Sequence, residues 1–257
     1  LANSPSPEIT MIVILDYGSQ YTQLIARKIR ALGVFAEIFP PDTPQAKVRA
    51  LRPDGLILSG GPASVYAKGA PKLPKWVIEQ DAPILGICYG MQLLARALGG
   101  NVRKGREHEY GLAELRVRAK SPLVEGLPKS SRVWMSHGDR IEELPEDFRR
   151  LGDSVNCPYA VVAHKKRPVF GLQFHPEVYH TEAGDRWLNN FVFGVCNARK
   201  NWKIKDFVQN TIETLREEIG DRRVVCATSG GVDSTVMAVL LHEAVDDQSV
   251  PVFVDNG

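Results

Sequence analysis

The segment GICYG, residues 86–90, constrains this chain more than any other feature. It joins an apolar run, residues 84–87, to a segment with helical periodicity. Glycines on both sides of Cys88 permit a sharp strand-to-helix turn, a nucleophile elbow, which presents a nucleophile at the carboxyl edge of a sheet. The helix N-terminus then favours the thiolate, the reactive form of cysteine. Cys88 is therefore a candidate nucleophile. The alternative is that Cys88 is a buried core cysteine on a tight strand-to-helix turn with no catalytic role.

A second feature supplies the partners that a cysteine nucleophile needs, a base and a group that orients the base. His175 follows the apolar run 169–174, and Glu177 comes two residues later, across Pro176. Because a residue before proline is extended, His175 and Glu177 can project to the same side of the chain. The pair predicts a base with its orienting carboxylate. A purely structural histidine is the alternative.

A third feature is the glycine pair Gly60–Gly61, which follows the apolar run 56–58. Glycines at a strand end let backbone N–H groups approach a ligand closely. Together with the N–H of Tyr89 they predict an oxyanion hole. A plain strand-to-loop turn is the alternative.

The order of apolar and helical segments indicates the fold class. Nearly continuous apolar runs at 11–16, 34–39, 56–58 and 84–87 alternate with helical patterns, which predicts a parallel α/β sheet covered on both faces. From about residue 113 to 174 the runs are short and separated by turn residues, which predicts antiparallel additions to the sheet.

A second unit begins near residue 200. We expect a helix over 204–219, a strand at 224–227, a loop at 229–234, another helix and a strand at 252–254. The predicted organisation is a disordered tail (1–10), one α/β domain (11–198) and the beginning of a second α/β domain (203–257). Two strands and two helices alone bury little core.

Composition excludes several classes of protein. The 257 residues carry a formal net charge of +2 and show no basic stripe, so we expect no nucleic-acid partner. The basic cluster at 164–167 lies between apolar runs and predicts a solvated hairpin turn. No apolar segment approaches the roughly 18 residues of a membrane span. The four cysteines form no CxxC pair, which indicates reduced thiols and a cytoplasmic location.

Three motifs together resemble the triad-type, class I glutamine amidotransferase family: SGGP (59–62), GICYGMQ (86–92) and FHPE (174–177). The resemblance extends over about residues 11–196. It implies a flavodoxin-like fold with Cys88 as nucleophile, His175 as acid and base, and Glu177 as the orienting carboxylate. It further implies roles for residues around the glutamine substrate: oxyanion donors from Gly61 and Tyr89, and glutamine contacts from Gln92, Ser136 and His137 of WMSHGD (134–139). For His137 a structural turn residue is the alternative.

The loop SGGVDS (229–234) lies between a predicted strand and a predicted helix, where backbone N–H groups bind phosphates. It lacks the GK[ST] ending of a Walker A loop. It resembles the pyrophosphate loop of ATP pyrophosphatases. The resemblance implies an adenine neighbour at Val254, Mg²⁺ near Asp233, and an ATP-binding set comprising Ser229, Gly230, Gly231, Val232, Asp233, Ser234 and Thr235.

A glutaminase domain followed by such an ATP domain resembles the ligases that aminate a purine nucleotide. That resemblance implies that xanthosine 5′-monophosphate (XMP) is adenylylated by ATP with Mg²⁺, and that ammonia from glutamine displaces AMP to give GMP. It also implies a cytoplasmic enzyme of purine biosynthesis that forms homodimers through a C-terminal region beyond residue 257. We therefore expect the chain to be a fragment or one piece of a longer protein.

Two other classes of function compete with this interpretation. One is a non-catalytic module with a glutaminase-like fold that senses nucleotide. The other is a stand-alone cysteine hydrolase. The complete set Cys88, His175 and Glu177 argues against the first, and Gln92 together with the SGGVDS loop argues against the second.

Overall fold

The computed structural model of the chain describes residues 10–253, apart from the side chains of residues 106–108. The chain divides into two compact units, residues 1–201 and 202–257.

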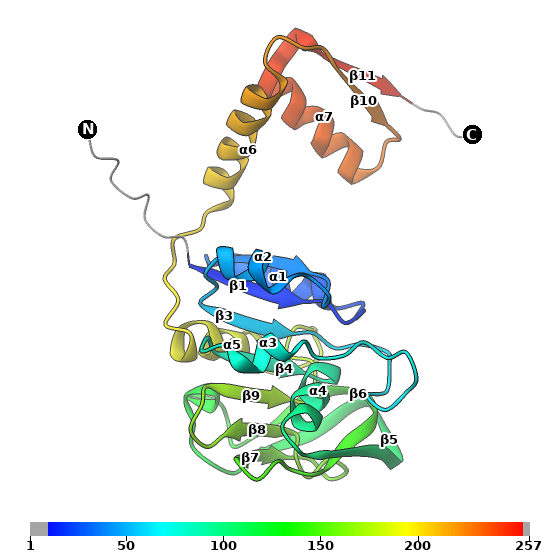
Figure 1. Ribbon diagram of the computed structural model, residues 1–257, viewed down its shortest axis with the longest axis vertical. Coiled ribbons are helices and arrows are strands. Elements are labelled where there is room, and N and C mark those ends of the chain that lie inside the picture. Colours follow the sequence, from blue (N-terminus) through cyan, green and yellow to red (C-terminus); the bar gives the residue numbers. More distant parts are fainter. Residues whose placement is uncertain (1–9, 254–257) are drawn as a thin grey trace. The chain divides into compact units, whose positions relative to one another are not determined.

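The first unit is built on one sheet of nine strands in the order β2-β1-β3-β4-β9-β8-β7-β5-β6. β2, β1, β3, β4 and β9 pair in parallel, and the strands beyond β9 pair antiparallel. The predicted parallel sheet with antiparallel additions is thus confirmed (Figure 1). The strands are β1 (Met11–Leu15), β2 (Phe35–Phe39), β3 (Gly55–Leu58), β4 (Ile84–Ile87), β5 (Asn101–Val117), β6 (Ser130–Glu143), β7 (Phe148–Asp153), β8 (Val161–His164) and β9 (Val169–Leu172).

Helices cover both faces of the parallel part of the sheet, because successive side chains of a strand point to opposite faces. Ile12 and Ile14 of β1 belong to a core that includes α1 and α5, whereas Val13 and Leu15 belong to a core that includes α2, α3 and α4. The helical segments are α1 (Thr22–Ala31), α2 (Gln45–Ala50), α3 (Lys75–Glu79), α4 (Tyr89–Ala97), the 3-10 turn η1 (Pro122–Val124), α5 (Gly184–Asn189) and the π-helical η2 (Asn190–Val195).

The antiparallel part differs from the prediction in length. Of the short predicted runs, 115–117 is the C-terminal end of β5 and 133–135 lies near the start of β6; these strands have 17 and 14 residues and form one ribbon. Pairing between the two backbones, with a register shift between Lys104 and Glu109, continues the strands through charged residues that carry no local strand signal. β7 also had no predicted counterpart. The basic cluster at 164–167 does form the turn between the antiparallel strands β8 and β9.

The second unit contains α6 (Ile204–Ile219), β10 (Val224–Thr228), α7 (Val232–Val245), the 3-10 turn η3 (Asp246–Gln248) and β11 (Ser249–Phe253). β10 and β11 pair in parallel, and the Arg216 side chain of α6 donates to the carbonyl of Ala244 in α7 at 2.9 Å. Among its described residues the buried apolar side chains are Cys226, Leu241, Ala244 and Val245.

The observed loop is shorter than the predicted one, residues 229–234, because α7 already begins at Val232. Ser234 Oγ and Thr235 Oγ1 both donate to the carbonyl of Gly231, at 3.0 and 2.9 Å, and the Thr235 N–H bonds the same carbonyl. These hydrogen bonds stabilise the first turn of α7 directly after Gly231, and they therefore draw residues 232–234 into the helix. Val254, the expected adenine neighbour, lies outside the described residues. No described helix combines the length and apolar character that a membrane span requires.

Candidate active site

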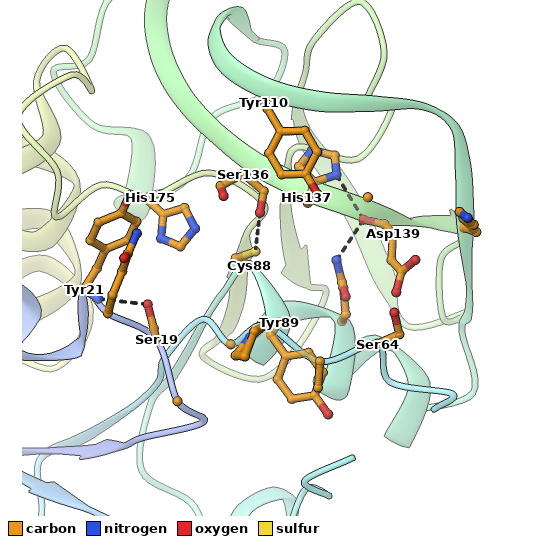
Figure 2. Close-up of a pocket in the computed structure, with 18 of the residues that line it drawn as sticks. Ser19, Tyr21, Ser64, Cys88, Tyr89, Tyr110, Ser136, His137, Asp139 and His175 are labelled. Atoms are coloured by element: carbon orange, nitrogen blue, oxygen red, sulfur yellow. Dashed lines mark hydrogen bonds between the residues drawn. The ribbon is translucent and has the colours of Figure 1, made fainter. Parts of the chain in front are cut away.

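A cavity of about 760 Å³ lies where the parallel strands β1, β3, β4 and β9 end. Carboxyl ends of parallel strands are the usual place for a ligand in such sheets. Most of the residues predicted around the glutamine line this cavity (Figure 2): Gly61, Cys88, Tyr89, Gln92, Ser136, His137 and His175. The structure therefore brings together segments that are far apart in the sequence.

Cys88 occupies a strained turn between β4 and α4. Its φ is 49° and its ψ is −106°, a conformation that costs a non-glycine residue about 1–3 kcal/mol. The turn is tight because a Cβ at Gly86 would lie 2.6 Å from the backbone nitrogen of Met91, and one at Gly90 would lie 2.4 Å from the carbonyl oxygen of Leu58. The flanking glycines are thus required by close backbone approach. They leave the Cys88 side chain at the edge of the cavity.

His175 and Glu177 form a buried pair. His175 Nδ1 lies 2.7 Å from Glu177 Oε1, and the exposed fractions of the two residues are 3% and 1%. A carboxylate only accepts, so Nδ1 carries the proton that it donates, and the other ring nitrogen, Nε2, remains for chemistry. The position of His175 is set by its backbone N–H, which donates to Trp134, and by its carbonyl, which accepts from Thr181 Oγ1 at 2.6 Å.

Gly60 makes room for His175 beside Cys88. A Cβ placed on Gly60 would lie 2.9 Å from His175 Cε1 and 3.6 Å from Cys88 Cβ. The His175 ring and Cys88 therefore both lie next to Gly60, in space that any larger residue at this position would occupy. Sequence reasoning assigned the glycine pair to oxyanion donors and missed this spatial role of Gly60.

The electrostatics of His175 favour its protonated form. Burial lowers the pKa of His175, but the charge of Glu177 and the hydrogen bonds with Cys88 and Glu177 outweigh it, so the pKa is raised well above its usual value. His175 therefore holds its proton to a higher pH than an unperturbed imidazole does.

A raised pKa stabilises the folded state, fully below the unfolded pKa of about 6.5, and this stability is lost as the pH rises through the folded pKa. We therefore expect the stability advantage of the parent chain over His175→Gln to be largest near pH 6 and to shrink toward pH 9. Urea unfolding followed by tryptophan fluorescence at several pH values measures it. An advantage that grows with pH would contradict the assignment.

The opposite wall of the cavity comes from β6. The carbonyl oxygen of Ser136 lies 3.6 Å from Cys88 Sγ, so Ser136 contributes its backbone (Figure 2). His137 lines the cavity, and its Nδ1 lies 3.0 Å from the carbonyl oxygen of Asp139. Its Nε2 lies 3.3 Å from Glu109 Oε2 without hydrogen-bond geometry. His137 thus combines the pocket position and the structural role that the sequence left as alternatives.

Glu109, His137 and Cys157 form a buried cluster whose nitrogen, oxygen and sulfur atoms lie within 4.8 Å of one another. Burial and the neighbouring Glu109 raise the pKa of Cys157 to about 12. Ser154 Oγ donates to Glu109 Oε1 at 3.0 Å. These residue types could ligate a soft divalent cation. The motifs in the sequence did not indicate Glu109 or Cys157, because neither lies in a recognisable ligand spacing.

Two buried amides connect the β6 wall to Cys88. Gln92 Nε2 donates to the carbonyl of Asp139 at 2.9 Å and to Gln173 Oε1 at 3.3 Å. Gln173 Nε2 donates to Cys88 Sγ at 3.7 Å. Sequence reasoning placed Gln92 at the site but overlooked Gln173. The signal in the sequence was a polar residue immediately before FHPE, at the end of a buried strand.

In the second unit, the predicted phosphate loop lies between β10 and α7. Gly230 has a φ of 78°, and Ser234 Oγ accepts from the backbone of Ser229 at 3.3 Å. Asp233 is exposed in the first turn of α7. A neighbouring cavity of about 390 Å³ is lined by Thr228, Gly230, Thr235, Ala238, Val239, His242, Pro251 and Phe253.

The amino-acid sequence of this chain is similar to those of known proteins. Residues 13–195 match the family model described as "Glutamine amidotransferase class-I". GMP synthase [glutamine-hydrolyzing] of Aquifex aeolicus is 51% identical over 96% of this chain, and that of Thermomicrobium roseum is 52% identical over 98%. The chain spans about half the length of these curated relatives, 48% and 47%.

Two solved structures also resemble this chain. A protein from Thermoplasma acidophilum, described as one subunit of a GMP synthase, is 33% identical, with a TM-score of 0.66, covering 79% of this chain and 98% of that one. A glutamine amidotransferase from Thermotoga maritima shares the fold with a TM-score of 0.54 at 20% identity, covering 95% of this chain and 99% of that one. With the cavity, the elbow and the buried histidine–carboxylate pair in place, the chain belongs to the class I glutamine amidotransferase family.

Proposed function

We propose that the first unit hydrolyses glutamine and supplies ammonia for the synthesis of GMP. The observation that carries this proposal is the buried pair His175–Glu177 beside Cys88, whose backbone is held in a strained turn at the cavity edge. A nucleophile, a base and an orienting carboxylate in this arrangement are the parts of an acyl-transfer triad.

The reaction follows from the positions of these groups. The Cys88 thiolate attacks the side-chain carboxamide carbon of glutamine, and the backbone N–H groups of Gly61 and Tyr89 stabilise the oxyanion. Tyr89 is the first residue of α4, where N–H groups have no partner within the helix. Protonated His175 donates to the leaving ammonia, which leaves a γ-glutamyl thioester. His175 then deprotonates a water, which releases glutamate. Gln92, Ser136 and His137 are the proposed glutamine contacts.

The acceptor half of the proposal concerns the second unit, residues 203–257, which follows the proposed glutaminase domain, residues 11–198, in the sequence. Ser229 to Thr235 are the proposed phosphate-binding residues for ATP, and Val254 is the proposed neighbour of the adenine. Asp233 fits Mg²⁺, because its exposed carboxylate at the start of α7 offers the hard oxygen that this ion prefers. An Mg²⁺ ion held there would supply positive charge against the phosphates. XMP is adenylylated by ATP with release of pyrophosphate, and ammonia then displaces AMP to give GMP. The relatives named GMP synthase support this half, and for the whole protein we propose a cytoplasmic homodimer.

One experiment tests both halves. Glutamate release from glutamine is measured with the purified chain, with and without Mg-ATP plus XMP, and a glutamine-analogue electrophile labels the reactive thiol. We expect glutamate release and a label on Cys88, which lines the cavity, while Cys157, which lies outside it and whose pKa burial raises to about 12, stays unlabelled. No release and no label in any condition would contradict the proposal and favour a nucleotide-sensing module. Release that nucleotides leave unchanged would contradict coupling within this chain.

A methyl group on Gly60 is expected to lower glutamate release about 100-fold, since displacements of about 1 Å in a catalytic group have costs of this size. In Gly60→Ala the new Cβ would lie 2.9 Å from His175 Cε1, so the ring must move away from Cys88. Gly194→Ala is the matched control, because its Cβ would meet the carbonyl of Pro122 at an ordinary 3.8 Å. Equal turnover numbers for the two variants would show that Gly60 does not position His175.

A further inference from the structure

We propose that Gln173 is a further catalytic residue, whose side-chain amide donates a hydrogen bond to Cys88 Sγ and stabilises the thiolate. This inference rests on the proposed function of Cys88 as nucleophile. The contact is a direct one, at 3.7 Å between Gln173 Nε2 and the sulfur.

The direction of this hydrogen bond follows from a chain of contacts that begins at a backbone carbonyl. The carbonyl of Asp139 can only accept, so Gln92 turns its NH₂ group toward it, at 2.9 Å. The same NH₂ group lies 3.3 Å from Gln173, which must therefore present its amide oxygen. The NH₂ group of Gln173 is then left to face Cys88. A flipped Gln173 would place two NH₂ groups against each other and an oxygen against the sulfur.

Burial makes this orientation obligatory. The exposed fraction of Gln173 is 0% and that of Gln92 is 3%, so neither amide can exchange its partner for bulk water. Leaving a buried donor or acceptor unpaired is unfavourable. The backbone of Gln173 is also held, because its N–H donates to the carbonyl of Ala160 at 2.9 Å. A rigid donor that is already aimed at the sulfur stabilises negative charge without reorganising.

Gln173 adds to the supports that the thiolate already has. Cys88 stands at the N-terminus of α4 and beside protonated His175. The contact with His175 changes during turnover, since His175 gives its proton to the amide nitrogen of glutamine, which leaves as ammonia. The Gln173 amide carries no exchangeable charge and stays a donor throughout. It therefore favours the thiolate both before attack and when the thioester is cleaved.

The test is the pH dependence of Cys88 alkylation by iodoacetamide, read for each cysteine by peptide mass spectrometry. In Gln173→Met, which keeps the shape but removes the donor, we expect the half-maximal pH to rise by about one unit and the rate below it to fall about tenfold. The plateau rate at high pH should stay within about twofold, because a fully formed thiolate needs no help to ionise. Gln173→Glu should raise the half-maximal pH further, because a carboxylate repels the thiolate.

Controls separate this effect from damage to the fold. Gln80→Met is matched, because the Gln80 amide is half-buried and donates to the carbonyls of Val77 and Ala82; it should leave the profile of Cys88 unchanged. Cys157 and Cys196 lie outside the cavity and burial raises the pKa of both thiols, so their alkylation in the same sample would report unfolding. If Gln173→Met unfolds by this criterion, the isosteric Gln173→Glu decides.

Two failures are distinguishable. A half-maximal pH that is the same in the parent chain and in a folded Gln173 variant overturns this inference and leaves the proposed function standing. A parent chain whose Cys88 is not alkylated, or reacts no faster than free cysteine at any pH, overturns the proposed function itself.

Discussion

Replacing Cys88 with alanine is expected to abolish glutamate release, a fall of about 10⁶-fold if the chain behaves like other triads that lose their nucleophile. The physical reason is that no other group described at the cavity edge can take over. Attack on the carboxamide requires the sulfur that β4 and α4 hold beside His175, and the alternative route through water lacks the thioester step. Discontinuous assay of glutamate over hours, with the parent chain as reference, measures the difference.

The control for Cys88→Ala is Cys226→Ala, a buried thiol on β10 that has no part in the proposed reaction. We expect its glutamate release to match the parent chain within about twofold. A Cys88→Ala variant that retains more than a hundredth of the parent activity would show that the sulfur is not the nucleophile, and the elbow would then be a structural turn.

Replacing Glu177 with glutamine is expected to lower glutamate release about 10⁴-fold, the order measured when a triad loses its orienting carboxylate. Glutamine has the same shape, so packing at this fully buried position changes little. Its NH₂ group can, however, donate to His175 Nδ1, which now lies 2.7 Å from a carboxylate oxygen. The proton would then move to the nitrogen that should act as base, and the imidazolium would lose the charge that stabilises it.

Glu182→Gln provides the comparison for Glu177→Gln. Glu182 is an exposed glutamate five residues later, and its carboxylate accepts from Arg132 at 2.7 Å outside the cavity. Its loss should leave glutamate release within about twofold. The thiol-directed label on Cys88 should also persist in Glu177→Gln, although more slowly. A fall of less than tenfold in Glu177→Gln would mean that Glu177 holds the loop only.

The catalytic motifs were predictable from sequence because each is local. The turn at Cys88 needs Gly86 and Gly90 within two residues, and His175 and Glu177 are only two positions apart, so both features are written in short stretches. The segment around Pro176 is a turn rather than the extended chain that the sequence predicted. The parallel strands were predictable for a related reason: strands buried on both faces are apolar throughout.

The remaining parts of the site depend on contacts between distant segments. Gln173 and Gln92 are 81 residues apart, and Glu109 and His137 meet only because β5 and β6 pair with a register shift. The length of that ribbon follows from hydrogen bonding between two backbones, which a charged stretch such as residues 101–110 does not reveal by itself. The role of Gly60 has the same origin, since its neighbour His175 lies 115 residues later in the sequence.

The sequence by itself determined the motifs of the proposed triad, the elbow, the family and the alternation of strands and helices, because these depend on residue types within a few positions of one another. Only the tertiary structure decided that a missing side chain at Gly60 admits His175, that His137 lies next to Glu109, and that Gln173 points its NH₂ group at the sulfur. Such features arise where separate strands end at one sheet edge, and the direction of a buried amide is set by its partners rather than by its neighbours in the chain.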